Sequence, residues 1–166
     1  MANITLGGNP ISTIGNLPEI GTIAPEFDAV KKDLTLFSSN ELVGKNIIIN
    51  IFASIDTGIC ADSTRRFNKE ASALENTVVI CISRDLPFAL GRICDAESLN
   101  DVIPVSAFNS SFGTDYGVTI LDGPMQGLLS RSVVVINTLG EVIYTEQVPE
   151  IAQEPDYDSA IAALTS

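Results

Sequence analysis

A cysteine at the start of a helix is the residue in this sequence best placed to do chemistry. Residues 46–52 form a β-branched and aromatic run typical of a buried strand, and from Cys60 onward apolar residues recur with helical spacing. Thr57 is a candidate N-cap, because its side-chain oxygen can accept the amide of the residue three positions on, which is Cys60. The unpaired amides and the dipole of the helix favour a thiolate there. An inert thiol buried under the helix fits the same pattern equally well.

The sequence holds no histidine, which excludes Ser-His-Asp and Cys-His catalysis and the usual mixed Cys/His zinc sites. The cysteines Cys60, Cys81 and Cys94 are too widely spaced for a CxxC motif, which disfavours thioredoxin-type dithiol exchange and zinc ribbons. Asp56 adds a negative charge beside the start of the helix, and the sequence leaves its direction open. If Cys60 is activated, backbone dipoles and an arginine must therefore activate it.

The composition indicates a single globular domain over residues 1–166. The 9 basic and 21 acidic residues give a formal charge of −12, which argues against nucleic acid or an anionic membrane as a partner. Residues 1–10 lack the pattern of a secretory signal, and no apolar run is long enough to span a membrane. We therefore expect a reducing cytoplasm, where a paired cysteine is more often catalytic than structural.

The order of the predicted elements indicates an α/β fold of the thioredoxin-like kind, with a central mixed sheet flanked by helices. Strand 46–52, helix 59–74 and strand 77–83 make one βαβ unit with parallel strands. The other predicted elements are an N-terminal β-hairpin (4–6 with 11–14), short strands at 27–31 and 34–37, a turn of helix at 39–43, a strand at 102–108, a short helix at 111–116, an irregular stretch at 117–131, a second hairpin (132–137 with 141–148) and a final helix after Pro155.

A second helix is predicted after the βαβ unit. Asp85 is its candidate cap and Pro87 suits its first turn, while Leu86, Ala89, Leu90 and Ile93 supply an apolar face. Gly91 weakens its middle by about 1 kcal/mol relative to alanine. In the strand that follows, Pro104 predicts an edge position, because proline cannot donate to a sheet ladder.

Several longer strings together resemble the peroxiredoxins, and within them the bacterial thiol peroxidase subfamily of atypical 2-Cys enzymes. The resemblance runs nearly end to end. It rests on Gly8-Asn9-Pro10, Asn50-Ile51-Phe52, Ser54-Ile55-Asp56-Thr57-Gly58-Ile59-Cys60, Cys81-Ile82-Ser83, Asp85-Leu86-Pro87-Phe88-Ala89, Arg92-Ile93-Cys94, Asp122-Gly123-Pro124, Arg131 before Val133-Val134-Val135-Ile136, and Glu154-Pro155-Asp156-Tyr157.

The resemblance implies a thioredoxin-dependent peroxidase that reduces hydrogen peroxide and organic hydroperoxides without a cofactor. Cys60 would be the peroxidatic cysteine, which becomes a sulfenic acid, and Cys94 the resolving cysteine of the same subunit. Thr57 would orient the peroxide, and Arg131 would stabilise the thiolate and the developing charge. The same resemblance implies thioredoxin as the reductant and a homodimer as the assembly.

The residue types suit that chemistry, although each has a plainer interpretation. Arginine stays protonated and presents a fixed fork, so Arg131 can bridge thiolate and substrate, and without the resemblance a surface ion pair would be the leading interpretation. Thr57 would then be no more than a cap. A disulfide needs Cα atoms within about 7 Å, so we expect the weak second helix to melt before Cys94 meets Cys60. Cys81, in the middle of a strand, is expected to be structural.

One residue departs from the family pattern, since Ala53 stands where the PxxxTxxC motif has proline. Proline fixes φ and lacks an N–H, so alanine leaves a softer loop and a less preorganised pocket. The alternative function is therefore a thioredoxin-fold binding or chaperone-like module with weakened peroxidase activity. An apolar approach that favours organic hydroperoxides would be lined by Phe88, Leu90, Ile93, Ile120 and Met125, and core packing explains the same residues equally well.

Overall fold

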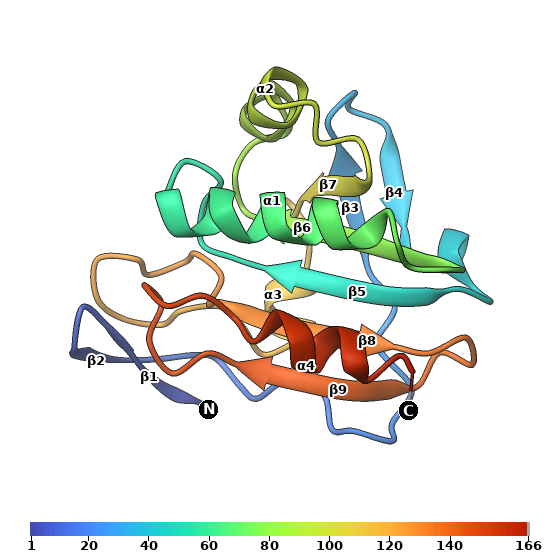
Figure 1. The fold of residues 1–166 in the computed structure, drawn as a ribbon. Coiled ribbons are helices and arrows are strands. Elements are labelled where there is room, and N and C mark those ends of the chain that lie inside the picture. Colours follow the sequence, from blue (N-terminus) through green and yellow to red (C-terminus); the bar gives the residue numbers. More distant parts are fainter. Residues whose placement is uncertain (166) are drawn as a thin grey trace.

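A seven-stranded mixed sheet runs through the computed structural model, which describes residues 1–165 (Figure 1). Its strand order is β4-β3-β7-β6-β5-β8-β9, with β5, β6 and β7 parallel to one another and the other neighbours antiparallel. The strands are β3 (Asp28–Lys31), β4 (Leu36–Ser38), β5 (Asn46–Ile51), β6 (Thr77–Ser83), β7 (Val102–Ser106), β8 (Ser132–Ile136) and β9 (Val142–Gln147).

Helices cover both faces of this sheet. In Figure 1, α1 (Gly58–Ala71) lies in front of β5 and β6, α4 (Tyr157–Ala162) lies in front of β8 and β9, and α3 (Phe112–Asp115) lies behind. A short 3-10 helix, η1 (Ser39–Leu42), and α2 (Pro87–Ala96), which packs against β7, complete the set. Within residues 1–165, no helix combines the length and the apolar character needed to cross a membrane.

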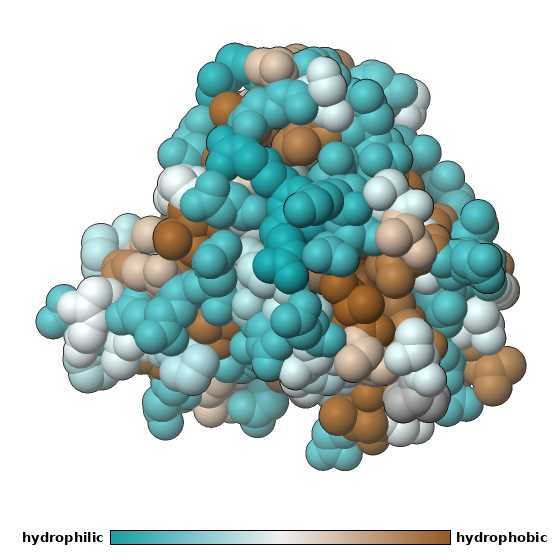
Figure 2. Space-filling view, viewed as in Figure 1, coloured by the Kyte–Doolittle hydropathy of each residue, from teal (hydrophilic) through white to brown (hydrophobic). Residues whose placement is uncertain are grey.

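The sheet separates two hydrophobic cores. Alternate residues of β5 face opposite sides, so Ile47, Ile49 and Ile51 join the core behind the sheet, and Ile48 joins the core under α1 and α4. Ile48, Ile49 and Ile51 are fully buried, and burial of such a side chain contributes about 1.5–3 kcal/mol. The surface in Figure 2 is largely hydrophilic, with hydrophobic atoms gathered between α1 and α4. The βαβ unit is thus fixed by two-sided burial of its central strands.

The predicted N-terminal hairpin is present as β1 (Asn3–Leu6) and β2 (Asn9–Ser12). Its two-residue turn, Gly7-Gly8, has positive φ values of 57° and 84°, which glycine adopts without strain. The hairpin packs as a third small cluster, in which Ile4 and Ile11 meet Ile120 and Ile151. It lies beside the end of the sheet where β5 stops and α1 begins (Figure 1).

Three details of the sequence prediction for α2 and β7 are wrong. Asp85 does not cap α2, because Leu86 occupies the N-cap position and Pro87 begins the helix. Leu86 is not on the buried face, since 53% of it is exposed. Pro104 does not mark a sheet edge, because β7 lies between β3 and β6. Its missing N–H is tolerated because β3 pairs only with the last residues of β7, Val105 and Ser106.

Candidate active site

Cys60 lies in the first turn of α1, directly after the loop that follows β5. Thr57 is the N-cap, and its Oγ1 accepts a hydrogen bond from the amide of Cys60 at 3.3 Å. The same hydroxyl donates to the carbonyl of Ser54 at 3.0 Å, so it acts both as an acceptor and as a donor. Cys60 is 1% exposed. The predicted N-cap is therefore confirmed, and it places Cys60 in the first turn of α1.

Arg131 reaches the sulfur from the residue before β8. Its Nη2 lies 3.0 Å from Cys60 Sγ, and its Nε donates to the carbonyl of Ile151 at 2.8 Å. The guanidinium is 1% exposed, so its charge acts on the sulfur with little screening by water. The sulfur of Cys60 therefore has a permanent cation as its hydrogen-bond donor. The structure thus brings Cys60, Thr57 and Arg131 into one site.

One nitrogen of Arg131 is left without a partner. Nη1 is one of two buried side-chain nitrogen or oxygen atoms within residues 1–165 that make no hydrogen bond, the other being Oδ1 of Asn50. A buried unpaired donor costs about 1–3 kcal/mol, and more for a charged group. Arg131 also lines the cavity beside Cys60. It therefore offers a free donor to a substrate oxygen bound there.

The cavity beside Cys60 has a volume of about 190 Å³ and mostly apolar walls. It is lined by Leu6, Ala53, Thr57, Gly58, Ile59, Cys60, Met125, Arg131, Ile151 and Ala152. Of the five residues predicted to line an apolar approach, only Met125 does so. Phe88 is 66% exposed on α2, Leu90 and Ile93 pack in the core under α1, and Ile120 packs under the hairpin.

Cys94 lies on α2, a different helix from Cys60. All three cysteines are free and buried. Burial raises the pKa of the Cys94 thiol to about 11, even though the nearby Lys32 opposes the shift. Burial also raises the pKa of Cys81 to about 12, and the side-chain amide of Asn50 donates to its sulfur at 3.7 Å. At neutral pH these two sulfurs are therefore protonated.

The comparisons with known proteins agree with this geometry. Residues 19–161 match the Redoxin family, and the chain is 55% identical over 164 residues to the thiol peroxidase of Mycobacterium tuberculosis, covering 99% of each chain. The chain belongs to the thiol peroxidases. The thiol peroxidase of Corynebacterium glutamicum is 51% identical over the same share of both chains. This protein is thus an enzyme, a thiol-dependent peroxidase.

The fold of this thiol peroxidase is also that of its structural relatives. A peroxiredoxin-like protein from Aquifex aeolicus superimposes with a TM-score of 0.91 at 34% identity, over 98% of this chain and 95% of that one. The thioredoxin-like fold with a mixed sheet and an N-terminal strand pair, predicted from the sequence, is therefore confirmed.

Asp85 is a residue of the site that the sequence prediction misplaced. Its carboxylate accepts from Ser54 Oγ and from the amide of Ile55, both at 2.7 Å, and from Ser83 Oγ at 2.6 Å. It therefore holds the loop between β5 and Thr57 from the end of the neighbouring strand. The available signal was its place directly after β6, because parallel neighbours end at the same edge of a sheet.

Asp56, whose direction the sequence left open, points to α2. Its carboxylate accepts from Arg92 Nη2 at 3.0 Å, and both side chains are exposed. The negative charge of Asp56 is thereby paired with a cation. This contact also links the loop that carries Thr57 to the helix that carries Cys94.

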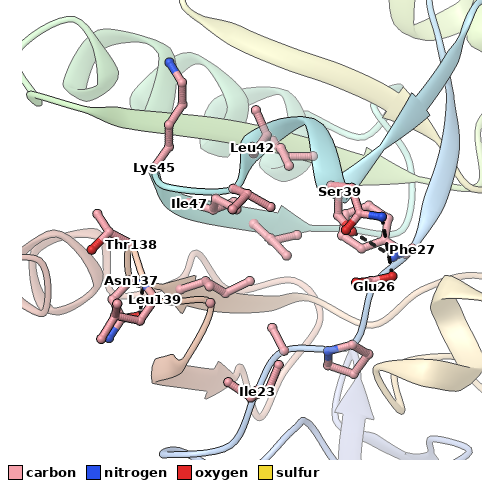
Figure 3. A pocket seen from close by; sticks show the side chains of 18 of the residues that line it. Ile23, Glu26, Phe27, Ser39, Leu42, Lys45, Ile47, Asn137, Thr138 and Leu139 are labelled. Atoms are coloured by element: carbon pink, nitrogen blue, oxygen red, sulfur yellow. Dashed lines mark hydrogen bonds between the residues drawn. The ribbon is translucent and has the colours of Figure 1, made fainter.

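A second cavity, of about 220 Å³, lies at the opposite end of the sheet (Figure 3). Segment 23–27, η1 and the β8–β9 turn enclose it, and its walls are largely hydrophobic. No cysteine lines it, and its charged lining residues are Glu26 and Lys45. Within residues 1–165, no cluster of three histidine, cysteine or acidic side chains is placed to hold a metal ion. Cys60, Thr57 and Arg131 therefore all line the smaller of these two cavities.

Proposed function

We propose that Cys60 is the peroxidatic cysteine of this enzyme and that hydrogen peroxide and organic hydroperoxides are its substrates. The observation that carries the proposal is the 3.0 Å contact between Arg131 Nη2 and Cys60 Sγ, at a cavity where Arg131 Nη1 has no partner. The thiolate attacks the terminal oxygen of the hydroperoxide, so that an S–O bond forms and the O–O bond breaks. The leaving oxygen takes a proton and departs as an alcohol, or as water from hydrogen peroxide.

Arg131 and Thr57 supply the donors that this step requires. Negative charge spreads over both peroxide oxygens as the O–O bond breaks, and fixed donors in a dry site stabilise it. The unpaired Nη1 of Arg131 is available to one oxygen. The hydroxyl of Thr57, which lines the same cavity, is available to the other once it turns from Ser54. Arginine remains charged throughout and therefore acts as an electrostatic stabiliser, not as a base.

Cys94 is the proposed resolving cysteine. Its sulfur attacks the sulfenic sulfur of Cys60, an S–S bond forms, and the hydroxyl leaves as water with the proton of the Cys94 thiol. Because both sulfurs are buried on separate helices, α2 must open locally before they meet. A dithiol reductant of the thioredoxin type then reduces the disulfide, which suits a reducing compartment such as the cytoplasm.

A thiol count tests the cycle directly. The reduced protein is treated with one equivalent of cumene hydroperoxide and analysed by non-reducing peptide mapping, beside Cys60→Ser, Cys81→Ser and Cys94→Ser variants. We expect loss of two thiols and a Cys60–Cys94 peptide, unchanged by Cys81→Ser. Survival of all three thiols would mean that Cys60 is not activated. The resemblance also supports a homodimer, which sedimentation of the reduced and oxidised protein tests.

A further inference from the structure

The cavity beside Cys60 has one wall that the sheet and α1 do not supply. Leu6 comes from β1, Met125 from the irregular segment before β8, and Ile151 from the loop after β9. All three belong to the small hydrophobic cluster under the hairpin, apart from the two main cores. The width of the cavity therefore depends on how the hairpin is held.

Glu150 holds the hairpin. Its Oε1 accepts from Thr5 Oγ1 at 2.9 Å and from the amide of Gly8 at 2.8 Å, while its Oε2 accepts from the amide of Ala152 at 2.8 Å. The main chain on either side pairs with the same strand, because Thr5 donates to Pro149 and accepts from Ile151. These hydrogen bonds lower the pKa of Glu150 to about 2, so the carboxylate stays ionised at neutral pH.

The segment held by Glu150 also fixes the catalytic cation. The carbonyl of Ile151 accepts the Nε–H of Arg131 at 2.8 Å, and Arg131 Nη2 lies 3.0 Å from Cys60 Sγ. One peptide unit therefore separates the residue that holds the hairpin from the carbonyl that orients the guanidinium. The backbone hydrogen bonds of Pro149 and Ile151 with Thr5 do not involve the Glu150 carboxylate, so they keep the Ile151 carbonyl at Arg131 when the carboxylate is lost.

We propose that Glu150 is a positioning residue that sets the selectivity of this enzyme for bulky organic hydroperoxides over hydrogen peroxide. The inference rests on the proposed reaction at Cys60. Hydrogen peroxide needs only the donors around the sulfur, whereas a bulky apolar hydroperoxide also contacts the wall formed by Leu6 and Ile151. A loosened hairpin removes that wall and leaves the sulfur in place.

The test compares kcat/KM for cumene hydroperoxide and for hydrogen peroxide. In Glu150→Ala, we expect the value for cumene hydroperoxide to fall about tenfold or more, as for lost contacts in an apolar pocket, and the value for hydrogen peroxide to fall much less. Glu150→Gln keeps one acceptor oxygen and should lie between the wild type and alanine. Leu6→Ala removes the wall without disturbing the Ile151 carbonyl, so only the value for cumene hydroperoxide should fall.

Glu41→Ala is the matched control. The Glu41 carboxylate likewise accepts a backbone amide, that of Ser38, and it caps η1 at the other end of the sheet. We expect Glu41→Ala to leave the ratio of the two kcat/KM values unchanged. An unchanged ratio in Glu150→Ala, or equal losses for both substrates, would overturn the inference.

Hydrogen exchange separates the role of Glu150 from the peroxidase function itself. Amides of residues 4–11 should exchange faster in Glu150→Ala than in the wild type, and at the wild-type rate in Glu41→Ala. Unchanged exchange in Glu150→Ala would overturn the role of Glu150, whatever the activity. A wild-type protein that consumes neither peroxide would instead overturn the proposed reaction at Cys60.

Discussion

The two helices that carry Cys60 and Cys94 are built in opposite ways. The helix α1 has 14 residues, a side-chain N-cap and a buried arginine at its cysteine. The helix α2 has 10 residues, begins at proline without a side-chain cap, and buries its cysteine as a thiol whose pKa is raised to about 11. Cys60 thus lies against a buried cation, and Cys94 lies in surroundings that favour its protonated form.

Besides the buried packing of Leu90 and Cys94, exposed ion pairs connect α2 to its surroundings. Asp56 pairs with Arg92, Lys32 pairs with Asp95 at 2.5 Å, and Arg65 on α1 pairs with Glu97 just after the helix. Exposed pairs of this kind contribute only about 0.2–1 kcal/mol each. These pairs therefore add little to the packing of Leu90 and Cys94, which an opening of α2 must break.

Gly91, which the sequence predicts to weaken α2, also has a role in packing. A Cβ at this position would lie 3.3 Å from Cβ of Lys32, closer than ordinary van der Waals contact. Glycine therefore lets α2 pack against the turn between β3 and β4. The residue that weakens α2 is also the one that allows it to pack closely in the reduced state.

Loss of the Arg131 guanidinium should have the largest effect on the peroxidase rate. It removes the buried cation that Cys60 has and Cys94 lacks. We expect Arg131→Met to lower kcat/KM for hydrogen peroxide about 10²–10³-fold, the cost typical of a lost charge-stabilising donor. Arg131→Lys keeps the positive charge but lacks the forked donors of the guanidinium, so kcat/KM should fall less than in Arg131→Met. Stopped-time peroxide assays on protein matched for thermal stability measure this, and wild-type rates in Arg131→Met would contradict the role of the cation.

The pH dependence of disulfide formation shows whether α2 opens before Cys94 attacks. Attack needs the Cys94 thiolate, so the rate should rise with pH. If α2 stayed folded, the rise would centre near the folded pKa of about 11. If α2 opens first, Cys94 should titrate near the ordinary thiol pKa of about 8.5, which is the outcome we expect.

The same shift in pKa bears on the stability of α2. Because the folded pKa lies above the unfolded one, its contribution to stability is complete below about pH 8.5 and is lost as pH rises through the folded value. Opening should therefore become easier at high pH. The chain has no tryptophan, so quenched-flow mass spectrometry is the suitable measurement. A midpoint near the folded pKa would mean that Cys94 attacks from an intact helix.

The sequence predicted the position of Cys60 at the start of α1 better than it predicted the cavity around Cys60. The βαβ unit and the Thr57 cap follow from local periodicity and capping rules, which act within a few residues. Leu6 and Ile151 could not be predicted to share a wall, because their meeting depends on where the hairpin docks. Phe88 was placed in the approach, but its position on α2 points it to solvent. The single-domain organisation and the homodimer stay predictions.

Alanine at position 53 should have an effect of intermediate size. Ala53 is buried and lines the cavity, so a stiffer residue there would fix the wall beside Cys60. We expect Ala53→Pro to raise the rate constant for peroxide reduction severalfold, with the rate of disulfide formation unchanged. Ala53→Gly, which loosens the same loop, is the matched variant in which the rate constant should fall. An unchanged or lower rate constant in Ala53→Pro would mean that the loop is already preorganised by Asp85.

Removal of the Asp56–Arg92 pair should give the smallest effect, and it acts on the link between the two helices. Asp56→Asn takes away an exposed pair worth about 0.2–1 kcal/mol, which corresponds to disulfide formation up to about fivefold faster if opening of α2 limits it. High salt should speed the wild type toward the variant, because it screens exposed charges. Glu70→Gln removes the Arg66–Glu70 pair within α1, which does not touch α2, and serves as the control. Equal acceleration in both variants would show that surface charge in general, and not this link, controls release of Cys94.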